Sequence, residues 1–99
     1  MFYNVLNAKE LVTEEKFNKK TLMKNNDSSL SIVGLKKEEI IDTHTSVSDA
    51  AVYVLDGKIQ LHFNAEEFTV EKGQMLLFKK DTEHKVLALK DSKFLLIKI

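Results

Sequence analysis

Short runs in which apolar and polar residues alternate, separated by polar breaks, follow one another from residue 17 onward. The breaks contain turn-forming groups such as Asn25-Asn26-Asp27 and Lys90-Asp91-Ser92. Many short strands at regular spacing are typical of an all-β sandwich or barrel. The pattern predicts nine strands: Phe17–Lys24, Ser29–Leu35, Ile40–Thr45, Ala51–Leu55, Lys58–Phe63, Glu67–Val70, Met75–Phe78, Lys85–Leu89 and Phe94–Ile99.

The pair Asp56-Gly57 is the strongest single turn signal. The apolar run Val52 to Leu55 precedes it, and the alternating run Lys58–Phe63 follows it. Glycine readily adopts the positive φ that a two-residue hairpin turn needs. We therefore predict a tight β-hairpin centred on this pair.

The residues before the first strand are expected to form a short N-terminal extension. Asn7-Ala8-Lys9-Glu10 has the form of a capping box, in which Asn accepts at a helix start and Glu reaches back. We expect at most one helical turn there. The predicted organisation is an extension over residues 1–16 and one β-domain over residues 17–99.

Composition narrows the classes of partner. With 99 residues the chain is long enough for one modest core, and its 15 basic and 15 acidic residues balance. The basic residues are scattered, so we expect no nucleic-acid partner. No apolar run is long enough to span a bilayer and the first residues lack a secretory pattern, so we expect no membrane partner and a cytoplasmic location. The absence of cysteine excludes disulfides and thiolate metal sites.

Two stretches resemble the paired signatures of the cupin superfamily, which are small conserved β-barrels of jelly-roll type. In the first, HTSVSDAAVYVLDG, His44 takes the place of the first histidine of a His-x-His pair and Gly57 closes the motif. In the second, GQMLLFKKDTEH, Gly73 and His84 fall in register. The resemblance covers roughly residues 30–97. It implies an all-β, antiparallel jelly-roll barrel behind the short N-terminal extension.

The sequence also departs from these signatures. In the family, three histidines and a glutamate hold a metal, and here the resemblance leaves only His44 and His84 of that set. The departures, taken in order, are Glu38 for the opening glycine, Ser46 for the second histidine, Ala50 for the glutamate, Lys79 and Asp81 for the proline and glycine of the second motif, and Ala88 for its asparagine.

We therefore expect no tightly bound metal cofactor. A catalytic transition-metal site usually offers three or more protein ligands. The alternative is a weakly bound divalent metal on His44 and His84, with Asp49 as a third ligand. Asp49 lies one residue before Ala50, and in a strand that single step turns the side chain to the opposite face. It can join the histidines only if a loop turns it inward.

The small residues at the lost ligand positions predict space inside the barrel. A mostly apolar space with a few convergent polar groups is how small-molecule sites are built. The opposing interpretation is that Phe or Met side chains from other strands fill this space. The predicted ligand pocket is lined by His44, Ser46, Ala50, Val52, His84, Val86 and Ala88.

Two classes of function fit these observations. The first is a small-molecule-binding or regulatory single-domain cupin without a complete metal site. The second is an enzyme, either a metal-dependent oxygenase or an acid-base isomerase or epimerase, that uses His44 and His84, both expected to point into the barrel. His62 shares a strand face with Lys58 and Gln60 and is expected to be exposed.

Finally, the strand pattern predicts a homodimer. If the pocket residues point inward, then Tyr53, Leu55, Leu87 and Leu89 point outward by the period of two. A monomer rarely exposes so large an apolar patch to water, and small barrels of the cupin type commonly pair through such a face. The strand Phe17–Lys24 is expected to reach across to the partner and cover an exposed edge.

Overall fold

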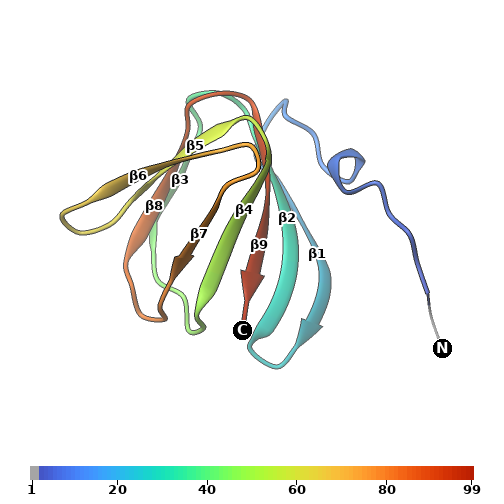
Figure 1. Cartoon of the computed structure of the whole chain (residues 1–99), viewed down its shortest axis with the longest axis horizontal. Helices are drawn as coiled ribbons and strands as arrows, with labels where there is room; N and C mark the ends of the chain where they lie inside the picture. Colours follow the sequence, from blue (N-terminus) through green and yellow to red (C-terminus); the bar gives the residue numbers. More distant parts are fainter. Residues whose placement is uncertain (1–2) are drawn as a thin grey trace.

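The computed structural model describes residues 3–99, which form two antiparallel sheets facing each other across one core (Figure 1). All nine predicted strands are present, with their ends shifted by at most two residues. The all-β jelly-roll prediction is confirmed. The strands are β1 (Asn18–Asn25), β2 (Ser28–Leu35), β3 (Ile40–His44), β4 (Ala50–Asp56), β5 (Lys58–His62), β6 (Glu67–Glu71), β7 (Met75–Phe78), β8 (His84–Ala88) and β9 (Ser92–Lys98).

The strand order explains how distant parts of the chain meet. One sheet has five strands in the order β1-β2-β9-β4-β7, and the other has four in the order β3-β8-β5-β6. Only β1–β2 and β5–β6 are sequential neighbours that pair within a sheet. The C-terminal strand β9 lies in the middle of the five-stranded sheet, between β2 and β4.

The predicted hairpin at Asp56-Gly57 is wrong, although the turn itself is present. Gly57 has φ +87°, as expected, but β4 pairs with β7 and β9 whereas β5 pairs with β6 and β8. The chain therefore passes from one sheet to the other at Gly57. A hairpin and such a crossing both need two apolar runs joined by a tight glycine turn, so the local pattern is the same.

The core lies between the two sheets. Along β4 the exposure alternates, with Val52 and Val54 buried and Tyr53 half-buried on the outer face. Phe94 of β9 is the largest fully buried side chain. Burying such side chains stabilises the fold by about 1.5–3 kcal/mol each relative to exposure. The interior cluster consists of Val33, Leu35, Val52, Val54, Ile59, Leu61, Val70, Val86, Ala88 and Phe94.

The N-terminal segment joins the sheet near one end of β1 and β2, and its first described residues extend away from the sheet (Figure 1, blue). It contains one 3-10 turn, η1 (Ala8–Glu10), without the predicted cap, because the Asn7 side chain donates to Glu10 Oε2 at 3.4 Å instead of accepting from a backbone amide. The Thr13 carbonyl lies where a side chain on Gly34 would point. Asn18 donates to that carbonyl and accepts from the Thr13 amide, at 2.8 and 3.0 Å. The division of the chain at residue 17 stays a prediction.

Candidate functional site

A cavity of about 150 Å³ lies between the two sheets. Strands of both sheets contribute to it, and it opens to solvent where the exposed residues Phe17, Lys19 and His44 line it. Its walls are mostly apolar, and its only polar lining residues within the described part of the chain are basic. It is lined by Phe17, Lys19, Val33, Ile41, His44, Val52, Leu61, Phe78, His84, Val86, Phe94, Leu96 and Lys98.

The structure brings together part of the predicted pocket. His44, Val52, His84 and Val86 line the cavity. The other predicted residues are buried but do not line it: Ser46, Ala50 and Ala88.

Local contacts of Ser46 and Ala50 accompany their positions outside the cavity lining. Ser46 belongs to the loop between β3 and β4, where its Oγ accepts from the Ser48 amide and its carbonyl accepts from the Asp81 amide, at 3.2 and 2.8 Å. Ala50 pairs with Phe78 across β4 and β7, and the Phe78 ring centroid lies 4.6 Å from that of His84. An aromatic ring therefore occupies part of the space beside His84, as the opposing interpretation expected.

The rings of His44 and His84 lie against each other. They are opposite each other on β3 and β8, with ring centroids 4.1 Å apart and planes tilted by 59°. Both rings line the cavity, but His84 is only 5% exposed whereas His44 is exposed, because β3 is an edge strand.

Backbone carbonyls fix the orientation of both rings. His44 Nδ1 lies 2.8 Å from the Asp42 carbonyl and His84 Nδ1 lies 2.9 Å from the Thr82 carbonyl. A carbonyl can only accept, so each Nδ1 carries the hydrogen, and in the neutral ring each Nε2 keeps its lone pair. Neither Nε2 has a hydrogen-bond partner among residues 3–99. The pair can therefore present two acceptors, or two donors when protonated, to a bound molecule.

Burial lowers the pKa of His84 below its usual value, since desolvation disfavours the imidazolium. The hydrogen bond to the Thr82 carbonyl opposes this shift, and the charges of His44 and Lys98 add to it. The pKa of Lys98 is lowered as well, first by desolvation and then by the charges of Lys19 and Lys24. The cavity is thus a region of unbalanced positive charge.

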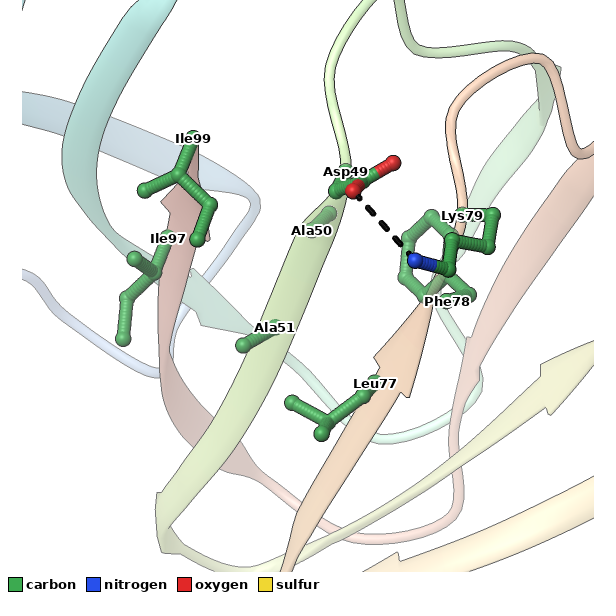
Figure 2. Close-up of a pocket in the computed structure, with 8 residues that line it drawn as sticks. All are labelled: Asp49, Ala50, Ala51, Leu77, Phe78, Lys79, Ile97 and Ile99. Carbon is green, nitrogen blue, oxygen red and sulfur yellow. Dashed lines mark ion pairs between the residues drawn. The ribbon is translucent and has the colours of Figure 1, made fainter.

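The residues present do not fit a transition metal of the kind the family holds. Asp49 Oδ1 accepts from the Lys80 amide at 2.9 Å, and Asp49 Oδ2 lies 3.7 Å from Lys79 Nζ (Figure 2). Within residues 3–99, no three His, Asp or Glu side chains are placed to hold one ion. Asp49 is therefore not brought together with the two histidines, which leaves fewer protein ligands than a catalytic site usually has.

Two residues that stand where the family signature has glycine adopt the positive φ that glycine favours. Glu38 has φ +77° and Asp81 has φ +64°, in the left-handed region that favours glycine. The Glu38 amide donates to the Ala88 carbonyl, and the Asp81 amide to the Ser46 carbonyl, each at 2.8 Å. These bonds hold the strained turns in place although the side chains differ from the signature.

The sequence interpretation missed the basic residues of the cavity, Lys19 and Lys98, because they lie outside both signatures. The period of two along β9 could have found Lys98, since Phe94, Leu96 and Lys98 all point inward. The expectation for His62 is wrong in part: its side chain is 28% exposed, Nδ1 lies 3.3 Å from Glu67 Oε2, and Nε2 is buried without a partner among the described residues.

Solved structures of a protein of unknown function and of two proteins described as cupins have the same fold. A conserved protein of unknown function from Streptococcus pyogenes superposes with a TM-score of 0.89, at 23% identity over 100% of this chain and 89% of its own. A cupin superfamily protein from Desulfitobacterium hafniense gives 0.87, at 14% identity over 100% and 92%. A cupin 2 conserved barrel domain protein from Leptotrichia buccalis gives 0.86, at 30% identity over 95% of this chain and 47% of its own.

No curated protein shows significant sequence similarity to the chain. Within residues 3–99, no helix is long and apolar enough to cross a membrane. The family model described as the cupin domain matches residues 31–99, which is more than half of the sequence and includes both signature stretches. The chain therefore belongs to the cupin family.

Proposed function

We propose that this cupin binds a small organic molecule in the cavity between its sheets, as a binding or regulatory protein without a complete metal site. The observation that supports this most directly is the combination of apolar walls with two oriented histidines whose Nε2 atoms lack partners. A cavity of about 150 Å³ is large enough for one benzene-sized ring. A few polar groups in an apolar cavity are the usual construction of a ligand site.

Uptake of a neutral probe tests this proposal. Benzyl alcohol should shift the methyl NMR signals of Val52 and Val86, which line the cavity. Val86→Phe should abolish the effect by filling the cavity, whereas Leu87→Phe, on the opposite face of β8, should preserve it. Equal responses in the two variants would contradict binding in this cavity.

An acid-base enzyme is the second candidate. The observation in its favour is that the Nε2 lone pairs of His44 and His84 are free to accept a proton from a bound substrate. Proton abstraction next to a carbonyl would incorporate deuterium from heavy water into a small ketone such as cyclohexanone. Incorporation that is lost in His84→Gln would support the enzyme, and its absence would favour a binding protein.

We also propose that the chain forms a homodimer, through a face that differs from the one predicted. Tyr53 and Leu55 lie on β4 of the five-stranded sheet, whereas Leu87 lies on β8 of the other sheet and Leu89 directly follows β8, so these four residues do not form one patch. The strand β1 pairs with β2 of its own chain. This pairing gives no support to the prediction that the first strand contacts a partner chain.

The outer face of the five-stranded sheet supports the dimer proposal instead. Cross-strand pairing places Leu77, Ala51 and Ile97 side by side, and their side chains project together in Figure 2. Met75, Tyr53 and Leu95 form the next row. Leu77 is 69% and Met75 54% exposed, so a continuous apolar surface meets water in the single chain. A second copy of the same face would cover it.

Analytical ultracentrifugation measures the oligomeric state directly. The wild type should sediment as a dimer at micromolar concentration, and Leu77→Lys should shift it to monomer. Val47→Lys is the matched control, since Val47 is 74% exposed and lies in the loop between β3 and β4 instead of on a strand of this sheet. A wild type that is only monomeric would contradict the proposal.

The cytoplasmic location expected from the sequence stays a prediction.

A further inference from the structure

The charged side chains that line the cavity, among the described residues, are two lysines. Lys19, His44, His84 and Lys98 are its polar residues, and no carboxylate among residues 3–99 lines it. Each of the two lysines extends from a different strand, Lys19 from β1 and Lys98 from β9. The two lysine charges therefore have no acidic partner in the lining formed by the described residues.

The lysine charges are not balanced by ion pairs within the protein. Neither Lys19 nor Lys98 pairs with a side-chain carboxylate in the described residues. The pKa of Lys98 is lowered first by desolvation and then by the charges of Lys19, which also lines the cavity, and of Lys24, which does not, so its surroundings disfavour the charged form of Lys98. A counter-charge from outside the chain would favour that charged form.

One carboxylate lies close to the cavity residue Phe17, but it is already engaged. Glu39 Oε2 accepts from the Phe17 amide at 3.2 Å, and Glu39 Oε1 accepts from the Lys36 amide at 2.7 Å. These bonds fix the segment that carries Phe17 against the turn before β3. Glu39 thus positions a cavity wall, and it does not line the cavity or neutralise its lysines.

We propose that the ligand of this cavity is a small monoanion with an apolar body, of the class of aromatic or short aliphatic carboxylates. The inference rests on the proposed binding function and adds the chemical class. The apolar body would pack against walls such as Val52, Val86 and Phe94, where burial is favourable. The anionic group would meet Lys98 and Lys19, where charge-assisted hydrogen bonds are stronger than neutral ones.

Benzoate and benzamide test the proposal, because they have the same shape and differ in charge. At about pH 7.5 and low salt, benzoate should bind the wild type at least tenfold more tightly than benzamide, which corresponds to one charge-assisted hydrogen bond. The benzoate affinity should fall as salt is added, and the benzamide affinity should not. This comparison uses the unmodified chain and needs no variant.

Variants then locate the charge. Lys19→Met should weaken benzoate binding about tenfold, and Lys20→Met should leave it unchanged, since Lys20 is the next residue of β1 and points to the outer face. Lys98→Met should weaken benzoate at least as much as Lys19→Met. Each variant keeps the aliphatic stem, and its circular dichroism and melting temperature establish that it is folded.

The outcomes separate this inference from the proposed function. If benzyl alcohol and benzamide bind as tightly as benzoate, the cavity binds small molecules and the anion inference is overturned. Benzoate binding that Lys19→Met and Lys98→Met both leave unchanged overturns it as well. If none of the three compounds binds, the proposed function fails and the inference fails with it.

Discussion

Two glycines with nearly the same backbone conformation allow one contact to be measured. Gly57 has φ +87° and Gly73 has φ +85°, so alanine is strained at either position. A Cβ on Gly73 would meet no atom within 4 Å. A Cβ on Gly57 would meet the Asp91 carbonyl and Ser92 Oγ, and would lie 2.8 Å from Ser92 Cα. The difference between the two substitutions therefore isolates the packing of the crossing against Ser92.

The expected magnitudes follow from the bonds that Ser92 makes. Ser92 is fully buried, and its Oγ accepts from the Lys58 amide at 2.9 Å and donates to the Lys90 carbonyl at 2.7 Å. Gly73→Ala should cost about 1–2 kcal/mol for the left-handed backbone alone. Gly57→Ala has the same cost and also displaces Ser92, which adds about 1–3 kcal/mol for a buried amide without a partner. We expect Gly57→Ala to lose about 2–5 kcal/mol in total.

Urea unfolding followed by far-ultraviolet circular dichroism, at one protein concentration, measures these losses. The slope with urea should stay the same in both variants while the midpoint falls further for Gly57→Ala. The variant Ser92→Ala measures the coupling between the two positions. The double variant Gly57→Ala with Ser92→Ala should lose less unfolding free energy than the sum of the two single losses, because both substitutions remove the same bonds. Equal losses for Gly57→Ala and Gly73→Ala would refute the reasoning.

Three further predictions follow from the site. Glu38→Gly and Asp81→Gly should each raise the free energy of unfolding by up to about 1 kcal/mol. Glycine removes the left-handed strain, but it also loses more entropy on folding, which limits the gain. Lower stability in both variants would contradict the assignment of strain. The pKa of His84 lies below its usual 6.5 in the folded state, so the unfolded chain takes up the proton first as the pH falls. The wild type should therefore lose stability relative to His84→Gln from about pH 6.5 downward, and a pH-independent difference between the two urea midpoints would contradict this. Untagged protein should contain far less than one transition metal per chain by elemental analysis, and chelator should not change its melting temperature; stoichiometric metal lost in His84→Ala would overturn this.

Local patterns were sufficient to predict the strands, because alternation and turn residues are local properties. They could not predict which strands share a sheet. The pattern around Gly57 is the same for a hairpin and for a crossing between sheets, and the choice depends on β9, which inserts beside β4 from the far end of the chain. The same limit separated Tyr53 from Leu87, which were predicted to share a face.

The candidate site was predictable to the extent that the family signatures carry it. His44 and His84 were identified from motif register, and they meet in the structure. Lys19 and Lys98 could not be placed with them, because the pairing of β1 with β2 and of β2 with β9 decides that they line the same cavity. Asp49 binds the Lys80 amide and the Lys79 ammonium group instead of joining the histidines. This arrangement also depends on a contact between segments that are distant in the sequence.

The central place of β9 has a consequence for how the chain is made. During synthesis, residues 28–35 and 50–56 emerge long before residues 92–98, yet both segments pair with that last strand. Until β9 leaves the ribosome, β2 and β4 expose unpaired edges and apolar faces, which are the features that make a nascent chain aggregate. Only the β1–β2 and β5–β6 hairpins can form early. We therefore expect folding to be slow for a domain of this size, because most of the strand pairing is non-local.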